Sequence, residues 1–401
     1  MKAFLIAGEA SGDALGAALM DGLRSLQPRI RFAGVGGALM QDRGLTSLFP
    51  MDELSIMGLA EILPKYFHLK RRIRETAAAI AREAPDVVVT IDSPDFCLRV
   101  LALAKAANPA LKTVHYVAPS VWAWRPGRAV KMARVVDHVL ALLPFEPPLM
   151  TAAGMGCDFV GHPIVAQPQA SAEEAASCRK DLLGQGEGPL ILVLPGSRRG
   201  EVTRLLPIFA RALAPLVAAQ PTARMVIPTT ANVTDLVTGL TRDWPQRPII
   251  LDPRQTSAQV YGRQKRAVFR AADVALAASG TVSLELAAAG TPMVIAYRLS
   301  ALSQAIISRM LKVDTVTLVN LVSETRHVPE FIGKNCTPEA IAPALMALLV
   351  EDSKRQVQLD AMTTTMTRLG RGGESPGLRA ARAVLSALGA APNGNDLSDR
   401  D

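Results

Sequence analysis

The sequence is poor in the features that mark several large classes of protein. It has four cysteines, at positions 97, 157, 178 and 336, and they form neither a CxxC pair nor a metal-ligand spacing. This usage excludes a disulfide-rich secreted scaffold and predicts reduced, buried thiols in a cytosolic protein. No window holds about 18 consecutive apolar residues, and Glu9 interrupts the N-terminal apolar run. We therefore expect neither a transmembrane helix nor a signal peptide.

Aromatic residues are scarce as well, at 4% of the chain, so alanine, leucine and valine must supply most of the packing. The formal net charge is +8, which favours anionic partners such as nucleotides, phosphorylated substrates, anionic lipid surfaces or nucleic acid. Aromatic RNA-binding motifs and a clustered basic stripe are missing, which counts against nucleic acid. A metal-binding DxD occurs only as Asp399-Arg-Asp401 in the polar tail, so no metal is expected.

The segment from Asp273 to Tyr297 has the pattern of a strand, a glycine turn, a helix and a second strand. Such a βαβ unit places its first turn at the carboxyl edge of a parallel sheet, where ligands bind. The turn consists of Ser279, Gly280 and Thr281, and its N–H groups with the positive end of the helix suit a diphosphate. Glu285, one turn into the helix, can accept two ribose hydroxyls. A plain crossover with a solvated Glu285 fits the segment equally well.

The same pattern of strand, glycine loop and helix occurs twice more, which predicts two Rossmann-like halves. Residues 2–7 lead into a loop that contains Ser11, and residues 190–194 lead into a turn in which Arg198 or Arg199 can reach a diphosphate. The polar stretch 167–188 marks the boundary between the halves. We predict a first domain over 1–170, a second domain over 171–350, C-terminal helices over 351–389 that pack on the first domain or on a partner subunit, and a disordered tail over 390–401.

Two aspartates follow the apolar strand 86–91 within a single turn. Carboxylates at the end of a parallel strand face the ligand crevice, where one of them can act as a general base. Asp95 is our candidate for that role, and Asp92 is the alternative. Helix capping explains either residue equally simply, and one could cap while the other works.

A stiff aromatic and cationic loop follows the strand 112–117. It contains Trp122, Trp124 and Arg125 between two prolines, which suits a sugar or a lipid phosphate. Packing at an interface is the alternative. His115, on the preceding strand, has the pattern of a core histidine rather than a catalyst.

Residues 54–74 join large apolar side chains to a basic cluster. This combination is typical of a helix that lies on a membrane surface. The alternative is a helix packed on its own sheet with a solvated basic end. The residues that would meet the membrane are Met57, Leu63, Phe67, Lys70, Arg71 and Arg72.

Five motifs occur in an order that resembles the lipid-A-disaccharide synthase family over about residues 2–350. They are Gly8-Glu-Ala-Ser-Gly-Asp13, His115-Tyr-Val-Ala-Pro-Ser-Val-Trp-Ala-Trp-Arg125, Phe159-Val-Gly-His-Pro163, Leu194-Pro-Gly-Ser-Arg198 with Glu201, and Ala278-Ser-Gly-Thr281 with Leu284-Glu285.

The resemblance implies the glycosyltransferase-B architecture, with two Rossmann-like domains and an interdomain cleft. It also implies that the domain over 1–170 binds the acceptor and the membrane and that the domain over 171–350 binds the UDP-sugar. The implied reaction joins UDP-2,3-diacylglucosamine to 2,3-diacylglucosamine 1-phosphate, and it yields UDP and a β-1,6-linked disaccharide. When an α-linked donor gives a β-glycoside, the configuration at C1 of the sugar inverts in one displacement. This displacement needs one base and stabilisation of the leaving diphosphate, but no cofactor. The family pattern puts the base at Asp95 and the donor contacts at Ser11, Arg198, Glu285 and Asn320. The chain departs from the family pattern at Cys97, Val319 and Gly333.

The implied location is the cytoplasmic side of the inner membrane of a Gram-negative bacterium, with peripheral attachment and a homo-oligomer as an option. Two rivals stay open at this point. One is a UDP-N-acetylglucosamine 2-epimerase or another UDP-sugar enzyme of the same fold, and the other is a non-enzymatic nucleotide- or RNA-binding protein.

Overall fold

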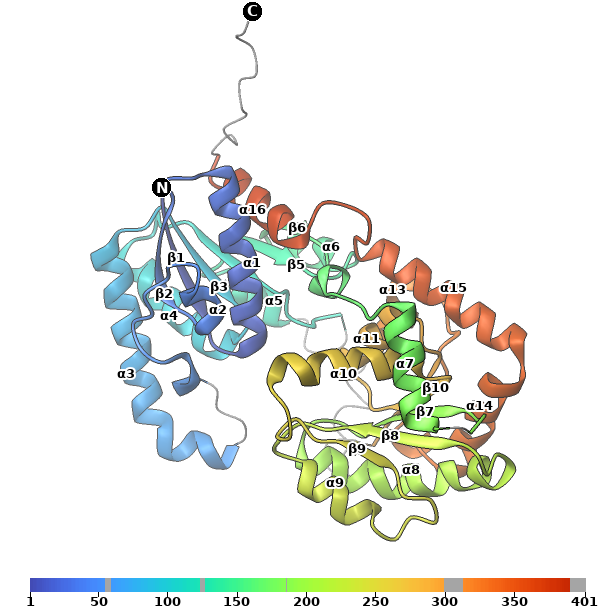
Figure 1. Cartoon of the computed structure of the whole chain (residues 1–401). Coiled ribbons are helices and arrows are strands. Elements are labelled where there is room, and N and C mark those ends of the chain that lie inside the picture. The colour runs from blue at the N-terminus through green and yellow to red at the C-terminus, as the bar shows by residue number, and fades with distance from the viewer. Residues whose placement is uncertain (55–58, 123–126, 185, 299–312, 390–401) are drawn as a thin grey trace, which may run out of the picture. The chain divides into compact units, whose positions relative to one another are not determined.

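The structure is a computed structural model that describes residues 1–54, 59–122, 127–184, 186–298 and 313–389, with the side chains of residues 59–66 left out of the description. The chain divides into two compact units (Figure 1). The first contains residues 1–166 together with the segment that starts at Gly372, and the second is Gln167–Arg371.

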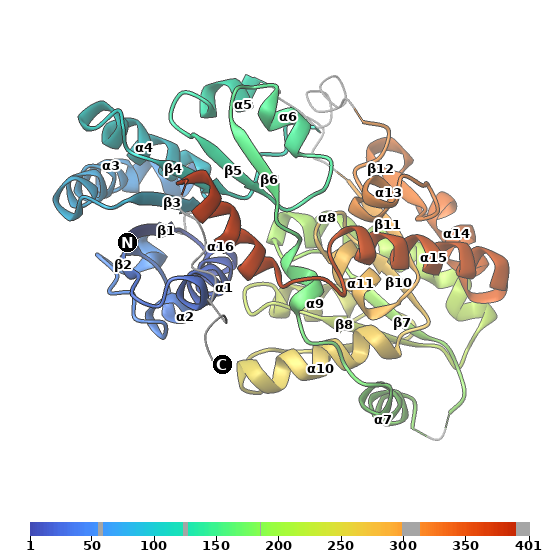
Figure 2. The same cartoon turned by 90° about the horizontal axis from the view of Figure 1, so that it is seen from above.

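The first unit is built on a parallel sheet with the strand order β2-β1-β3-β4-β5-β6, whose strands are labelled in Figure 2. Its central strands are apolar on both faces, as parallel strands covered by helices must be. The strands are β1 Lys2–Ala7, β2 Arg31–Val35, β3 Val87–Ile91, β4 Thr113–Tyr116, β5 His138–Ala141 and β6 Gly156–Phe159. The helices and 3-10 turns are α1 Ala10–Leu26, α2 Ala38–Gln41, η1 Met51–Glu53, α3 Leu59–Glu83, α4 Pro94–Ala107, α5 Gly127–Met132, α6 Pro147–Thr151, η2 Pro163–Ala166 and α16 Pro376–Ala387.

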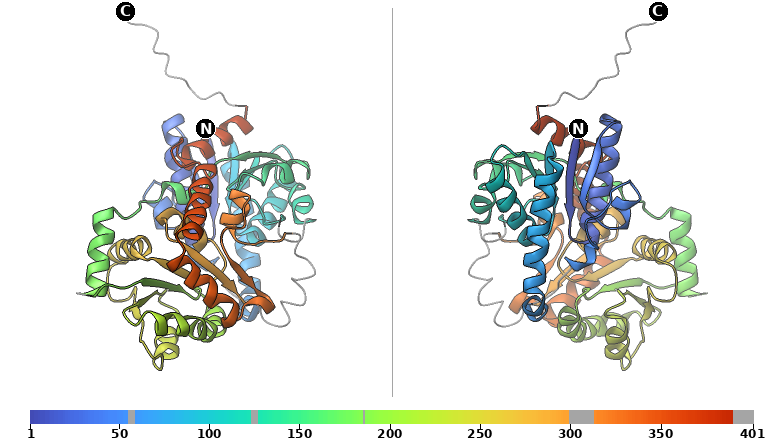
Figure 3. Two further views of the ribbon diagram at one scale, coloured as in Figure 1. Left: turned by 90° about the vertical axis from the view of Figure 1, so that its right-hand side faces the viewer. Right: turned by 90° about the vertical axis from the view of Figure 1, so that its left-hand side faces the viewer.

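Helices cover both faces of this sheet. Residues of α1 and α16 share one core with one face, and residues of α3, α4 and α5 share another core with the opposite face. Figure 2 shows α16 alongside α1. The two backbones come close at Gly22, where a Cβ atom would lie 2.6 Å from the Gly377 carbonyl oxygen. Figure 3 shows α3, in light blue, as a long helix beside the sheet.

The second unit has its own parallel sheet in the order β12-β11-β10-β7-β8-β9. Its strands are β7 Leu190–Leu194, β8 Arg224–Pro228, β9 Ile249–Leu251, β10 Val274–Ala277, β11 Met293–Tyr297 and β12 Glu330–Ile332. Its helices and 3-10 turn are α7 Ala172–Leu183, α8 Arg199–Ala219, α9 Thr234–Thr241, α10 Ala258–Ala271, α11 Val282–Ala289, α13 Leu318–Ser323, η3 Gly333–Asn335, α14 Pro338–Val350 and α15 Asp352–Arg368. The predicted fold class, α/β with two Rossmann-like halves, is confirmed.

Among the described residues, α8 is long and apolar enough to cross a membrane by length and composition alone. Its apolar residues nevertheless form part of the core of the second unit, where they pack beneath β7, β8 and β10. We therefore read α8 as a core helix of the second sheet. The buried residues of α8 are Val202, Leu205, Leu206, Phe209, Ala212, Leu213 and Leu216.

Two boundaries matter for the site. The helix after β3 begins at Pro94, because proline at the first helical position is preorganised for a helix start, so Asp95 lies in the first turn. The predicted C-terminal segment 351–389 is divided: α15 belongs to the second unit, and α16 packs on α1. The predicted disordered tail, 390–401, lies outside the described residues.

Candidate functional site

In the first unit, three segments that contain predicted site residues follow the strands β1, β3 and β4. These strands are neighbours and run parallel, so their carboxyl ends meet at one edge of the sheet. Asp95, Ser11 and the loop that contains Trp122 follow β3, β1 and β4 respectively. The sequence prediction that these segments line one edge is therefore supported by strand order.

The turn after β3 has an unusual backbone. Asp92 and Ser93 are both left-handed, with φ of 52° and 43°, a conformation that costs free energy for residues other than glycine. The turn also packs tightly on the β1 loop, because a Cβ atom on Gly8 would lie 2.5 Å from Ser93 Oγ. Such strain at a sheet edge is typical of a functional site.

The two aspartates of this turn have different surroundings. The Asp92 carboxylate accepts the Ser93 N–H at 2.9 Å, and the Asp92 N–H donates to the Tyr116 carbonyl at 3.0 Å. Asp95 is exposed in the first turn of α4. Asp92 therefore fixes its own turn, whereas the carboxylate of Asp95 is open to a ligand.

Asp95 lines a cavity of about 500 Å³ within the first unit. That volume suits a small ligand such as a monosaccharide. One wall comes from the start of α4 and another from α5. The lining residues are Pro94, Asp95, Leu98, Pro119, Gly127, Arg128, Lys131 and Met132.

The predicted aromatic loop is described only in part. Trp122 is half-buried and its ring meets Phe145 edge-on, with 5.5 Å between ring centroids. Trp124 and Arg125, the other predicted acceptor contacts, lie outside the described residues. Ser11 is exposed in the first turn of α1.

Two buried groups near this edge are structural. Asp13 accepts the backbone N–H groups of Gly37, Leu39 and Met40 at 2.8–3.1 Å, which caps the start of α2. His115 is 1% exposed and its Nδ1 lies 2.7 Å from Thr90 Oγ1. Burial lowers the pKa of His115 to about 4, so the ring is neutral near pH 7. This supports the interpretation of His115 as a core residue.

Glu146 was missed by the sequence reasoning. It follows β5 at the same edge, is 3% exposed, and accepts the Leu143 N–H at 3.0 Å. Burial raises the pKa of Glu146 to about 7. The nearby Trp122 indole N–H acts in the opposite direction and lowers the pKa of Glu146, because it stabilises the ionised carboxylate. The geometry between the two groups is nevertheless outside that of a hydrogen bond. In the sequence, Glu146 stands before two prolines, a pattern that is typical of any helix start. Its burial, which only the structure shows, distinguishes it from an ordinary residue at such a position.

In the second unit, the predicted donor residue Arg198 follows strand β7, and the predicted donor residues 279–281 and Glu285 follow strand β10. These two strands are neighbours in the sheet. The side chain of Arg198 is 72% exposed and its Nη1 lies 3.2 Å from Glu201 Oε1. Gly196 has φ of 106° and Gly280 has φ of 151°, so both turns need glycine. Ser279 and Thr281 flank Gly280 just before α11, where the first N–H groups of the helix have no partner within it.

Glu285 is already engaged in an ion pair. Its Oε2 lies 2.6 Å from Lys265 Nζ, which comes from α10. Both side chains are 34% exposed, so the pair is open to solvent at this edge. The sequence analysis did not predict a role for Lys265. Nothing in the sequence indicates that a side chain of the preceding helix contacts Glu285, which lies 20 residues further along the chain.

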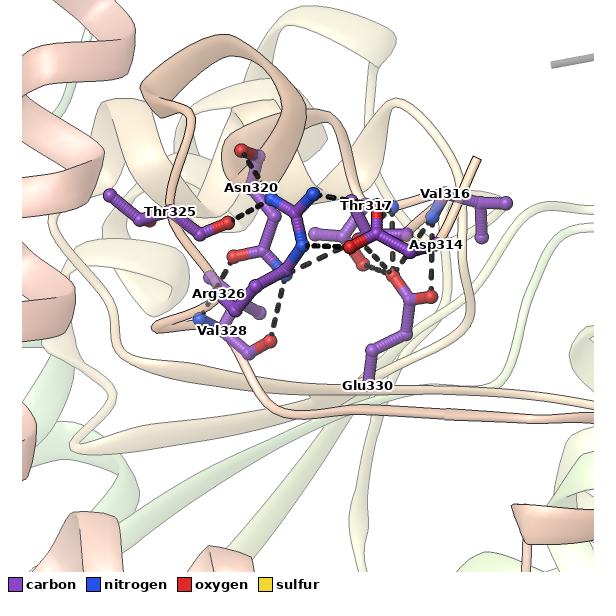
Figure 4. Close-up of polar contacts among 9 residues, drawn as sticks. Asp314, Val316, Thr317, Asn320, Thr325, Arg326, Val328 and Glu330 are labelled. Atoms are coloured by element: carbon purple, nitrogen blue, oxygen red, sulfur yellow. Dashed lines mark hydrogen bonds and ion pairs between the residues drawn. The ribbon is translucent and has the colours of Figure 1, made fainter. Parts of the chain in front are cut away.

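Asn320, whose donor contact stays a prediction, has hydrogen-bond partners within the protein. This side chain is 1% exposed. Its Oδ1 accepts the Val328 N–H at 3.0 Å and its Nδ2 donates to the Val328 carbonyl at 2.9 Å (Figure 4). The same cluster holds Glu330, which accepts the N–H groups of Val316 and Thr317 (Figure 4). Asn320 thus joins two backbone segments, and its polar atoms are already satisfied by the protein.

The structure shows the surroundings of the three residues that depart from the family pattern. Cys97 and Val319 are both 0% exposed and pack in the cores. Gly333 has φ of 62°, a left-handed conformation that favours glycine.

The predicted membrane segment is only partly described. Phe67 is 80% exposed, and Lys70 and Arg71 are exposed on the same helix, α3. Met57 lies outside the described residues, as does the side chain of Leu63.

Arg72 is a correction to the predicted basic surface. Its guanidinium makes hydrogen bonds of 2.7 and 2.8 Å to the two carboxylate oxygens of Glu53, and it bonds Glu75 at 2.7 Å. It also lies 4.4 Å from the centroid of the Phe49 ring. The Arg72 hydrogen bond holds the pKa of Glu53 below its ordinary value. Arg72 therefore anchors α3 to η1 instead of facing a lipid surface.

Across the described ranges, no group of three or more His, Cys, Asp or Glu residues could hold a metal ion.

Sequence comparisons give one consistent family. The profile of the family described as "Lipid-A-disaccharide synthetase" matches residues 3–381. A lipid-A-disaccharide synthase of Ruegeria pomeroyi is 60% identical over 388 residues, which cover 97% of this chain and 96% of the relative. One from Rhodospirillum centenum is 45% identical over 386 residues, with 96% and 94% covered.

Structural comparisons reveal the fold. The S. aureus MnaA–UDP co-structure is similar with a TM-score of 0.62 and 14% identity, covering 96% of this chain and 94% of that one. A UDP-GlcNAc 2-epimerase from Neisseria meningitidis, bound to UDP-GlcNAc, has a TM-score of 0.59 and 13% identity, covering 97% and 99%. At these identities the likeness extends to the architecture alone.

Proposed function

Because the chain belongs to the lipid-A-disaccharide synthetase family, a family of glycosyltransferases, we infer that it joins UDP-2,3-diacylglucosamine to 2,3-diacylglucosamine 1-phosphate. The products are UDP and the β-1,6-linked lipid A disaccharide 1-phosphate. The observation that carries this inference is the 60% identity to a lipid-A-disaccharide synthase along nearly the whole of both chains. The epimerase alternative is not favoured, since its relatives share only the fold.

We propose that Asp95 is the general base. It takes the proton from the 6-hydroxyl of the acceptor as that oxygen attacks C1 of the donor sugar. The bond between C1 and the diphosphate oxygen breaks in the same displacement, so the α-linked donor gives a β-glycoside and UDP leaves with its electron pair. The exposed carboxylate of Asp95 in a cavity of sugar size supports this role.

The developing charge on UDP needs compensation. We assign it to Arg198 and to the helix N-terminus behind Ser279, Gly280 and Thr281, which supply a fixed cation and fixed dipoles. Glu285 would accept the ribose hydroxyls, and Ser11 would contribute from the β1 loop. The proposed chemistry requires no cofactor or metal.

We further propose that α3 attaches the enzyme to the cytoplasmic face of the inner membrane, from which it draws its acylated substrates. The supporting observation is that Phe67, Lys70 and Arg71 are exposed together near the start of the described part of α3. An exposed aromatic ring beside cations suits the interface of an anionic bilayer.

Purified protein incubated with both acylated substrates tests the reaction. We expect one disaccharide and one UDP per turnover, with activity that persists in excess chelator. A parallel incubation with UDP-N-acetylglucosamine and no acceptor tests the epimerase alternative. Conversion of that sugar without any disaccharide synthesis in the first assay would overturn the proposed function.

A further inference from the structure

The cavity beside Asp95 has a cationic wall that the proposed chemistry has not used. Arg128 and Lys131 both line this cavity, and both come from α5. They are three residues apart on one helix, so their side chains lie on the same face. Asp95 lines the cavity from α4, and the remaining lining is mostly apolar, with Leu98 and Met132 among it.

We propose that Arg128 and Lys131 form the subsite for the phosphate group of the acceptor. This inference rests on the proposed function. It adds the two residues that select the 1-phosphate of this acceptor. It uses only the described part of the loop region, that is Pro119 and residues from Gly127 onward.

The chemistry of the acceptor sets the geometry. Its 6-hydroxyl and its 1-phosphate are attached to the same sugar ring, so a ligand whose hydroxyl meets Asp95 must place its phosphate within one ring of that carboxylate. A cavity of about 500 Å³ holds both groups together. Asp95 and the phosphate are both anionic and repel each other, whereas Arg128 and Lys131 attract the phosphate to their part of the lining.

The two cations suit this task in different ways. The Arg128 guanidinium is planar and can form two parallel hydrogen bonds to phosphate oxygens. Arg128 is half-buried, so its side chain starts from a restricted position. Lys131 is exposed and adds a point charge that can adjust to the ligand. The apolar part of the lining would contact the sugar face or the first acyl carbons.

The test compares two acceptors, 2,3-diacylglucosamine with and without its 1-phosphate, in neutral detergent micelles that contain no anionic lipid. The parent enzyme should prefer the phosphorylated acceptor in kcat/KM. In Lys131→Ala and in Arg128→Gln this preference should fall by roughly 10- to 100-fold, as expected for the loss of a charged hydrogen bond. The KM for the UDP sugar should not follow this change.

Two further variants control for indirect effects. Arg134→Gln removes a cation from the segment just after α5 that does not line the cavity, and it should keep the preference of the parent. Lys131→Arg keeps the charge and should retain most of the preference. Lys131 is exposed, so its variants report on the subsite even if Arg128→Gln fails to fold.

The outcomes separate the two hypotheses. A parent enzyme that makes no disaccharide from either acceptor would refute the proposed function itself. An active parent whose preference for the phosphate survives in both Lys131→Ala and Arg128→Gln would refute the phosphate subsite alone. Equal losses with the two acceptors would also refute it, because the residues would then act on folding or on Asp95 and not on the phosphate.

Discussion

Lys265 Nζ lies 2.6 Å from Glu285 Oε2, so the carboxylate proposed to bind ribose is already paired with a cation from the neighbouring helix α10. The pair is one-third exposed, which limits its own contribution to stability because water screens it. Its functional consequence is orientation: the ammonium fixes one carboxylate oxygen and leaves the other for a ligand hydroxyl. The ribose site is therefore expected to depend on two residues, of which the βαβ motif contains only one.

Arg198→Ala and Glu285→Ala should each weaken UDP binding, Arg198 through the diphosphate and Glu285 through ribose. Loss of a hydrogen bond to a charged group is worth about 1.5–3 kcal/mol, or roughly 10- to 100-fold in Kd. Titration calorimetry with UDP measures this directly. Arg211→Ala is a matched control, because Arg211 lies on α8, the helix that begins directly after Arg198, is also 72% exposed, and pairs with Glu339 instead. Unchanged affinity in both variants would place the nucleotide elsewhere.

Asp95→Asn should lower turnover by roughly two to four orders of magnitude while the protein folds normally, because the amide cannot accept the proton. Steady-state rates with saturating substrates, together with a thermal unfolding curve, measure the two effects separately. Asp92→Asn is the comparison, since Asp92 bonds its own turn and should show its main effect in unfolding. If Asp92→Asn loses turnover and Asp95→Asn does not, the assignment of the base is reversed.

Replacement of Met57, Leu63 and Phe67 by serine should release the part of liposome binding that high salt leaves intact. Burial of apolar surface contributes about 25 cal/mol per Å² whatever the ionic strength, whereas each basic residue near an anionic leaflet adds about 1 kcal/mol that salt screens. Co-sedimentation with anionic liposomes at low and high salt separates the two parts. UDP affinity should be unaffected.

The structure adds two comparisons to this experiment. Phe67→Ser alone should show part of the loss, whereas Leu103→Ser, also an exposed apolar residue of the first unit, should not. Arg72→Ala should reduce stability rather than binding, because Arg72 is held by Glu53 and Glu75. A triple variant that sediments as well as the parent would mean that this face of α3 packs on protein.

Glu146 makes the stability of the protein depend on pH. Its pKa rises from an ordinary 4.5 to about 7 on folding, so between these values the folded state holds a proton that the unfolded state has lost. The free energy of unfolding should therefore fall as pH rises from about 4.5 through 7, by about 3 kcal/mol for a shift of this size.

Glu146→Gln should abolish this fall, because the amide does not titrate. Urea unfolding of parent and variant at pH 5 and pH 8 measures the difference, which should move in favour of the variant at the higher pH. Glu53 should affect the pH dependence of stability in the opposite direction, because folding lowers its pKa and its contribution is lost as the pH falls. Glu53→Gln should remove that contribution. Parallel curves for parent and Glu146→Gln would show that Glu146 titrates normally.

Most of the strands were predictable from sequence alone, because apolar runs of strand length next to glycine turns permit few alternatives. The βαβ unit from β10 to β11 lies within the predicted segment from Asp273 to Tyr297, and Gly280 and Gly290 mark its turns by their positive φ. The order of the motifs also identified the family. These are local properties: hydrophobic periodicity, turn chemistry and residue spacing are all present in the chain before it folds.

The tertiary structure decided what each polar residue is free to do. Asn320 and Arg72 looked available in sequence, yet Val328 satisfies the first and Glu53 and Glu75 bind the second. Glu146 and Lys265 carried no signal in sequence and became important only through burial and through a contact 20 residues away. Burial and long-range pairing depend on how helices pack on the sheets, and these determine whether a charged or polar side chain meets solvent, protein or ligand.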